Sequence, residues 1–191
     1  MIGNDIVDLN NMATQSNWKR ARFLDTVFSE KEQLIISVSE NPHQMVWLFW
    51  SMKEAAYKLY VQQFGKRFFN PKKLVCRLFS STIGYVSIEN RTYPTTSIIS
   101  NDYIYTVATL NNSQNYKSAI FEVEDKSYLT QSNSLKNRLL ESISKNKDLN
   151  FQDLYVRKDL VGVPQLFYNN SKLPIQFSLT HCGNYCGFVY F

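Results

Sequence analysis

The segment of the chain with the clearest chemical potential reads Trp50-Ser-Met-Lys-Glu-Ala-Ala-Tyr-Lys58. On a helix, residues four positions apart lie on one face, so Trp50, Glu54 and Lys58 form a single stripe. Glu54 followed by Lys58 is also the favourable order for an ordinary surface ion pair, which adds little to stability. Taken alone, the segment is therefore compatible with a simple ion pair or with one wall of a reactive site.

A second carboxylate, Asp5, changes this balance. Residues 2–9 alternate and are rich in Ile and Val, which predicts a short strand with Asp5 and Val7 on one face. An unpaired carboxylate inside such a strand is costly, so Asp5 lies either at a strand end facing solvent or in a site. Magnesium binds few protein oxygens and keeps several waters. Asp5 from a strand and Glu54 from a helix are therefore candidate ligands of Mg²⁺.

The predicted elements around these residues begin with helices. Residues 18–38 are predicted to be helical, and Ser29 with Glu32 forms a capping box. Pro42 opens the next helix, which runs to near Gly65 and carries Glu54. The inward stripe of the first helical region is predicted to be Leu34, Ile35 and Val38.

The rest of the chain is predicted to alternate between sheet and helix. Antiparallel strands are predicted at 74–80, 84–88, 103–109 and 117–124. A polar linker follows at 126–133, then an amphipathic helix at 134–145, and 151–191 returns to strand and turn. The inward positions of that helix are Leu135, Leu139, Leu140 and Ile143. The pattern indicates an α+β protein with antiparallel sheets and a long helix.

Composition and charge narrow the classes of function. The chain has 191 residues, a formal net charge of +5 and 44% apolar residues, which is typical of a globular protein with an anionic partner. No cluster of basic residues or recognition motif indicates nucleic-acid binding, although the charge and aromatic content keep it as a third alternative. No apolar run predicts a signal peptide or membrane span, and three free cysteines suit a reducing compartment, so a cytoplasmic location is predicted. A zinc site at His181, Cys182 and Cys186 lacks a second ligand cluster.

Three motifs give the chain a specific resemblance. Gly3-Asn-Asp-Ile-Val-Asp-Leu9 resembles a G-x-D-I signature, and Trp50–Lys58 resembles a W/F-x-x-K-E-A-x-x-K signature. Ser178-Leu-Thr-His181 resembles a third signature, S-x-S-H. In this order they are similar to the motifs of the 4′-phosphopantetheinyl transferase superfamily. The resemblance reaches both ends of the chain.

The resemblance implies the 4′-phosphopantetheinyl transferase fold, with two similar α/β halves forming a pseudodimer. We predict a first half at 1–125, with the G-x-D-I strand and the K-E-A helix, and a second half at 126–191, with the S-x-T-H motif. The motif order is that of the small holo-acyl-carrier-protein synthases, whereas the length suggests a circularly permuted form of the larger, surfactin-synthetase-activating type. The permuted form requires neighbouring termini and favours a monomer. The alternative is a small-type fold with an insertion that assembles as a trimer.

The activity implied by the resemblance is Mg²⁺-dependent transfer of 4′-phosphopantetheine from coenzyme A to a serine of an apo acyl or peptidyl carrier protein, releasing 3′,5′-ADP. Asp5 and Glu54 are then the metal ligands, and Glu54 or a water on the metal accepts the serine proton. Glu54 and Lys58 are the catalytic residues, with Lys58 against the pyrophosphate. The predicted coenzyme A-binding residues are His181, Thr180, Lys58, Lys53 and Lys158.

The sequence departs from the family at two positions. Val7 stands where the larger type has a third acidic metal ligand, which leaves a two-carboxylate site. Val163 stands where that type has the lysine of G-K-P, which helps to bind coenzyme A phosphate. This keeps open a non-catalytic relative that binds coenzyme A or a carrier protein without transfer. Candidate substitutes for the missing lysine are Lys136, Arg138, Arg157, Lys158 and Lys172, and Lys66 and Arg67 are further candidates for a contact with phosphate.

Overall fold

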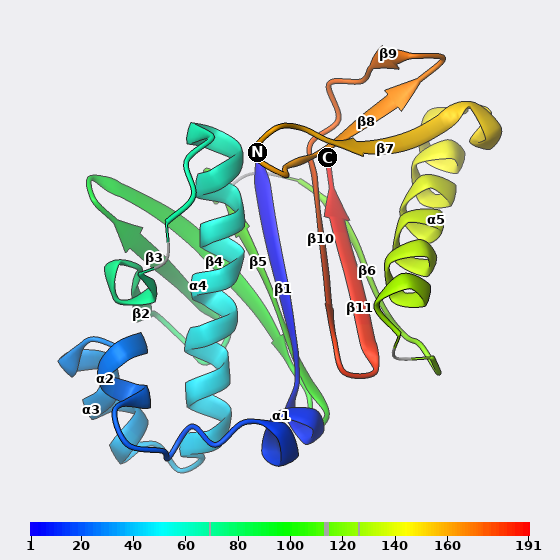
Figure 1. The fold of residues 1–191 in the computed structure, drawn as a ribbon. Coiled ribbons are helices and arrows are strands. Elements are labelled where there is room, and N and C mark those ends of the chain that lie inside the picture. Colours follow the sequence, from blue (N-terminus) through cyan, green and yellow to red (C-terminus); the bar gives the residue numbers. More distant parts are fainter. Residues whose placement is uncertain (69, 113–114, 126) are drawn as a thin grey trace.

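The strand that carries Asp5 lies in the middle of the molecule, between its two halves (Figure 1). The computed structural model describes residues 1–68, 70–112, 115–125 and 127–191. β1 (Ile2–Asp8) is an end strand of a five-stranded antiparallel sheet in the order β1-β5-β4-β3-β2. All seven residues of β1 are buried, which confirms the predicted strand but removes the option of a solvent-facing Asp5.

The other strands of this sheet are β2 (Val75–Leu78), β3 (Ile83–Ile88), β4 (Arg91–Ile99) and β5 (Tyr103–Thr109). β4 was not predicted, because Pro94 and the polar run around it hide the alternation that marks a strand. Its buried face includes Thr95 and Ser97, and the hydroxyl of Ser97 lies 2.9 Å from that of Thr106 on β5. Polar residues that satisfy each other's hydrogen bonds can occupy such buried positions.

The N-terminal helices differ from the prediction. The single helical region expected at 18–38 is split into α2 (Phe23–Val27) and α3 (Glu30–Val38), after a short α1 (Leu9–Gln15). The predicted capping box of Ser29 and Glu32 is present at the start of α3. The predicted inward stripe is wrong: α3 buries Glu32 and Ile36 instead. The three stripe residues are exposed, to 64% for Leu34, 38% for Ile35 and 74% for Val38.

α4 (Pro42–Phe64) is the long helix that carries Glu54, and its bounds match the prediction. Asn41 caps its first turn, and Gly65 ends it in the left-handed conformation, with a φ of 63°. α4 lies directly on β1: a Cβ atom at Gly3 would collide with the backbone oxygen of Ala55. The glycine of the G-x-D-I motif therefore allows the close approach that brings Asp5 and the K-E-A helix together.

The described residues of the second half form one more long helix and six strands. β6 (Lys117–Glu122), β10 (Phe177–Cys182) and β11 (Tyr185–Tyr190) form a sheet in the order β10-β11-β6, against which α5 (Tyr128–Lys147) packs. β7 (Leu154–Lys158), β8 (Pro164–Tyr168) and β9 (Ser171–Lys172) form a separate antiparallel ribbon. Two short 3-10 helices, Pro71–Lys73 and Phe151–Asp153, complete the described elements.

Two expectations for this half need correction. β6 was predicted as part of the first antiparallel set, but it pairs with β11, across the predicted boundary at 125. The predicted linker at 126–133 is helical from Tyr128, although Lys126 lies outside the described residues. The inward positions predicted for α5 are confirmed, because Leu135, Leu139, Leu140 and Ile143 are all buried.

The predicted fold class is confirmed: the protein is α+β, with antiparallel sheets and a long helix packed on a sheet in each half (Figure 1). The two chain ends lie at the same end of the molecule (Figure 1), and Ile2 and Val189 share one apolar cluster. The permuted arrangement requires this proximity, and the permutation itself stays a prediction. Among the described residues, no helix combines the length and apolarity needed to span a membrane.

Candidate active site

The junction between β1 and β10 is closed by side-chain hydroxyls. Ser178 Oγ accepts a hydrogen bond from the backbone N–H of Asn4 (3.2 Å), and Thr180 Oγ1 accepts one from that of Ile6 (3.1 Å). Thr180 Oγ1 also donates to Asp5 Oδ1 (3.2 Å). These bonds satisfy the edge of β1 that faces away from β5. The S-x-T-H motif therefore holds Asp5 in place across the boundary between the halves.

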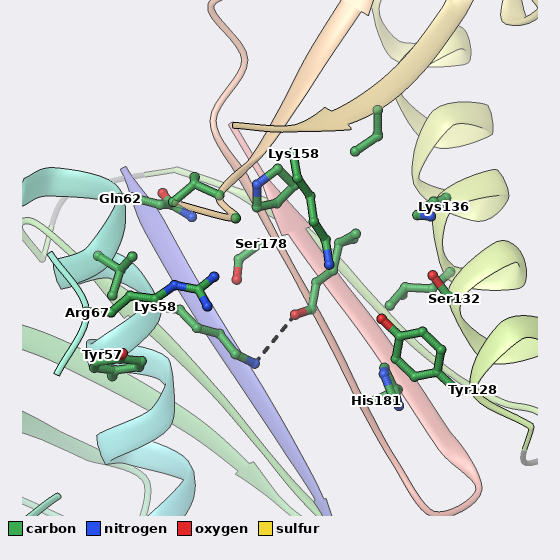
Figure 2. Close-up of a pocket in the computed structure, with 17 residues that line it drawn as sticks. Tyr57, Lys58, Gln62, Arg67, Tyr128, Ser132, Lys136, Lys158, Ser178 and His181 are labelled. Carbon is green, nitrogen blue, oxygen red and sulfur yellow. Dashed lines mark hydrogen bonds between the residues drawn. The ribbon is translucent and has the colours of Figure 1, made fainter. Parts of the chain in front are cut away.

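Lys58 joins the same cluster from α4. Its ammonium donates to the backbone oxygen of Asn4 (2.8 Å), to Asp5 Oδ1 (3.2 Å) and to the backbone oxygen of Leu179 (3.4 Å). The last of these is the dashed line in Figure 2. The ordinary ion pair with Glu54 that the spacing also allowed is replaced by a pair with Asp5. Lys58 thus bridges both halves of the molecule.

The negative charge of Asp5 acts on Glu54. Burial, followed by the negative charge of Asp5, raises the pKa of Glu54 to about 7, although Lys58 opposes the rise. Burial also raises the pKa of Asp5, against the lowering effects of Lys58 and Thr180. None of the described residues donates a hydrogen bond to the Glu54 carboxylate. Lys58 therefore offsets the negative charge of the two carboxylates only in part, and the pKa of Glu54 stays raised.

The chemistry of these donors fits a hard divalent cation. Two buried carboxylates, of which Asp5 adds to the raised pKa of Glu54, are the kind of oxygen ligand that Mg²⁺ uses, with water completing its shell. No third His, Cys, Asp or Glu joins them, since the described part of the chain contains no cluster of three such side chains. The zinc alternative at His181, Cys182 and Cys186 gains no support for the same reason.

A cavity of about 560 Å³ opens beside Lys58, between α4, α5, the β7–β8 ribbon and β10 (Figure 2). Its lining contains four cationic residues and, among the described residues, no Asp or Glu. Such a surface is suited to a polyanionic ligand. The polar and charged lining residues are Tyr57, Lys58, Gln62, Arg67, Tyr128, Ser132, Lys136, Lys158, Ser178 and His181.

A comparison with models of known protein families identifies the family to which the chain belongs. The model of the family described as the 4′-phosphopantetheinyl transferase superfamily matches residues 1–108, which is more than half of the 191 residues. This chain belongs to the 4′-phosphopantetheinyl transferase superfamily. The matched range contains Asp5, Glu54 and Lys58, whereas His181 lies beyond it. The general activity of the superfamily, phosphopantetheinyl transfer, is supported for the chain by this membership.

The chain was also compared with solved structures and with curated protein sequences. Among solved structures, the holo-[acyl-carrier-protein] synthase of Thermotoga maritima matches 90% of this chain and 83% of its own chain, with 11% sequence identity and a TM-score of 0.45. A comparison with curated protein sequences finds no match.

Two residues predicted from the superfamily motifs to bind coenzyme A do not face the cavity. Lys53 is 1% exposed, and its ammonium is bonded to Glu32 Oε2 (2.9 Å) and to the backbone oxygens of Val27 and Pro71. Thr180 is 4% exposed, and its hydroxyl is occupied by Asp5 and Ile6. Lys53 is adjacent to Glu54 in the chain and therefore points to another face of α4, where it is enclosed. In this structure the Thr180 hydroxyl contacts Asp5 and Ile6, and a role of either residue in binding coenzyme A stays a prediction.

His181 does reach the cavity, where it lies beside Tyr128. Their ring centroids are 5.6 Å apart in an edge-to-face arrangement, and Figure 2 shows both rings on the α5 side. Burial, followed by the charge of Lys58, lowers the pKa of His181. The neutral imidazole has one N–H donor for an anionic ligand. Tyr128 was missed because it falls in the predicted linker; Ser127, which caps α5, is the signal that indicated a helix there.

The positively charged candidates for the role of the missing G-K-P lysine divide into two groups. Lys136, Lys158 and Arg67 line the cavity together with Val163 itself. The guanidinium of Arg138 instead lies over the Phe121 ring (4.0 Å), and that of Arg157 over the Tyr155 ring (4.8 Å). Lys66 and Lys172 are exposed and are not part of the lining.

Proposed function

We propose that this protein transfers 4′-phosphopantetheine from coenzyme A to a serine of an apo acyl or peptidyl carrier protein, with Mg²⁺, and releases 3′,5′-ADP. One observation carries the proposal: Asp5 and Glu54 come together beside Lys58, at the edge of a cavity that has cationic but no acidic lining residues among those described. Coenzyme A carries a pyrophosphate and a phosphate monoester, which match a cationic cavity next to a divalent-cation site.

In the proposed reaction, the serine oxygen forms a bond to the phosphorus next to pantetheine, and the bond from that phosphorus to the bridging pyrophosphate oxygen breaks. Lys58, with its ammonium at the cavity, stabilises negative charge on the leaving 3′,5′-ADP. Glu54, or a water beside it, accepts the serine proton. His181 binds a phosphate of coenzyme A from the opposite wall.

Asp5 and Glu54 would hold the metal ion in this proposal. When bound, Mg²⁺ supplies positive charge that offsets the pyrophosphate and makes the phosphorus more susceptible to attack. Thr180 fixes the orientation of Asp5 through its hydrogen bond to Oδ1. A cation held by Asp5 and Glu54 would also keep Glu54 ionised near neutral pH.

The proposed protein partner is an acidic carrier protein, which a net charge of +5 would attract by long-range steering. The alternative, a relative that binds coenzyme A or a carrier without transfer, is favoured by Val163, an apolar residue in the cavity lining. The two functions differ in one product, the carrier bearing phosphopantetheine.

The experiment is to incubate the protein with apo-carriers, coenzyme A and Mg²⁺ and to measure the carrier by mass spectrometry. We expect a gain of one phosphopantetheine group and a loss of transfer when Mg²⁺ is chelated. Glu54→Gln should slow transfer by about a hundredfold or more, the scale of losing a base or metal ligand. Glu141→Gln, which changes an exposed glutamate on α5, is the matched control. An unchanged mass across several carriers would remove the transferase proposal.

A further inference from the structure

Arg67, from the loop after α4, lies directly against Gly162, in the loop between β7 and β8. A Cβ atom at Gly162 would collide with Nη2 of Arg67 and lie 3.2 Å from its Cζ. Gly162 also has a φ of +81°, a conformation that residues with side chains rarely adopt. The guanidinium therefore occupies the space that a side chain at position 162 would need, one residue before Val163.

The loop that presents Gly162 is fixed by its own hydrogen bonds. Asp159 Oδ1 accepts from the backbone N–H groups of Val161 (3.0 Å) and Val163 (2.9 Å). The backbone N–H of Asp159 also donates to the backbone carbonyl of Val163 (2.9 Å). Asp159 thus uses its carboxylate on its own loop and not on Arg67. The turn holds both Gly162 and Val163 against the cavity.

The guanidinium of Arg67 keeps its donors available. Among the described residues it makes no ion pair and no hydrogen bond, in contrast to Lys58, which has three acceptors. Arg67 lines the cavity, and Figure 2 shows it extending from the α4 side between Lys58 and the β7–β8 ribbon. A guanidinium at such a position presents a planar pair of N–H donors that matches two phosphate oxygens.

We propose that Arg67, seated on Gly162, is the phosphate-binding cation that replaces the lysine absent at position 163. The charge enters the cavity from the loop after α4 instead of from the β7–β8 loop, and it lies next to position 163 because Gly162 has no side chain. Its ligand is a phosphate of coenzyme A, either the 3′-phosphate monoester or the pyrophosphate. The inference rests on the proposed function only in that the cavity binds coenzyme A; transfer is not needed.

The test is titration calorimetry of coenzyme A and 3′-dephospho-coenzyme A with wild type, Arg67→Ala and Arg67→Lys. Arg67→Ala should weaken coenzyme A binding about tenfold to a hundredfold, the scale of losing charged hydrogen bonds, and Arg67→Lys should restore only part of it. A loss for coenzyme A alone assigns the 3′-phosphate, and an equal loss for both ligands assigns the pyrophosphate. Lys66→Ala, an exposed neighbour outside the lining, is the control and should bind as wild type does.

A second variant tests the replacement itself. Adding Val163→Lys to Arg67→Ala should restore coenzyme A affinity to within a few fold of wild type, because the family's lysine would then supply the missing charge. Coenzyme A binding by Arg67→Ala within twofold of wild type would overturn the inference, as would a double variant as weak as Arg67→Ala. If the wild-type protein binds coenzyme A but does not modify a carrier protein, the proposed transfer is removed, while the proposed role of Arg67 in binding is unaffected.

Discussion

Two lysines on α4, five positions apart, form ion pairs in different surroundings. Lys53 and Glu32 are each 1% exposed, and their charged atoms lie 2.9 Å apart. Lys58 and Asp5 are 29% and 11% exposed, with 3.2 Å between Nζ and Oδ1. Each ammonium donates to one carboxylate and two backbone oxygens. The bonding pattern is the same, so the difference lies in what surrounds each pair.

The Lys53 pair is closed on every side. Glu32 Oε1 accepts from the backbone N–H of Cys76 (2.7 Å), and Oε2 also accepts from that of Ser29 (2.7 Å). This pair connects α3, α4 and β2 and leaves no room for a ligand. The Lys58 pair borders the cavity and has Glu54 nearby, a carboxylate without a hydrogen-bond donor among the described residues. Removing one partner of an enclosed pair leaves a buried, uncompensated charge and destabilises the fold, whereas a pair with one open side can exchange partners with a substrate.

The largest expected effect is on stability, at the closed pair. Lys53→Met leaves the Glu32 carboxylate buried without its cation, which should cost about 3–5 kcal/mol in the free energy of unfolding. Urea denaturation measures this loss. Lys31→Met, on the exposed face of α3, should change it by less than about 0.5 kcal/mol. A Lys53→Met protein as stable as the control would show that the closed pair is not structural.

The matching substitution at the open pair should spare stability and reduce activity. Lys58→Met should slow carrier modification about a hundredfold, because the charge on the leaving group loses its cation. The free energy of unfolding should fall by less than for Lys53→Met, since the Lys58 ammonium is partly solvated and the Asp5 carboxylate, whose pKa burial raises, can take up a proton. Single-turnover transfer rates and urea denaturation of the same preparation provide the comparison. Equal stability losses for Lys53→Met and Lys58→Met would contradict the distinction between the pairs.

The pH dependence of stability tests whether the pKa of Glu54 is raised in the metal-free protein. In the metal-free protein the pKa of Glu54 is raised from 4.5 to about 7, so the folded state binds this proton more tightly than the unfolded state. Its favourable contribution is complete below pH 4.5 and is lost as the pH rises through about 7.

The measurement is urea denaturation of wild type and Glu54→Gln in EDTA between about pH 5 and pH 8. Because Gln does not ionise, Glu54→Gln should become more stable relative to wild type as the pH rises, by roughly 2 kcal/mol over the range. Mg²⁺ added at the higher pH should stabilise wild type and have little effect on Glu54→Gln. Parallel pH curves for the two proteins would rule out a strongly raised pKa.

The smallest effect concerns the hydroxyl that holds Asp5. Thr180→Val removes a hydrogen bond to Asp5 Oδ1 and leaves the N–H of Ile6 unpaired, which should cost about 1–2 kcal/mol of stability. As a positioning change, it should also raise the Mg²⁺ concentration required for transfer about tenfold, and Thr180→Ser should restore most of that affinity. A Thr180→Val enzyme with normal Mg²⁺ dependence would separate Thr180 from the metal site.

Local patterns predicted the elements that carry the site. The strand of Asp5, the helix from Pro42 and the capping box of Ser29 and Glu32 each depend on neighbours within a few residues, and all are present. β4 was missed because its buried face carries the polar residues Thr95 and Ser97, and the hydroxyl partner of Ser97, Thr106, lies on another strand. The stripe of α3 was wrong because the buried face of a short helix is chosen by what it packs against, here Lys53 and its surroundings.

The sequence by itself determined the motifs, their order and the chemical types of Asp5, Glu54 and Lys58, because these follow from residue identity and short-range periodicity. Only the tertiary structure decided which cations reach the cavity. In the folded protein Lys53 is enclosed, and Lys58 pairs with Asp5 instead of Glu54. The Thr180 hydroxyl donates to Asp5, and Arg67 lies against Gly162. The physical reason is that each of these contacts joins residues far apart in the chain, so packing within the first half and between the two halves sets their distances.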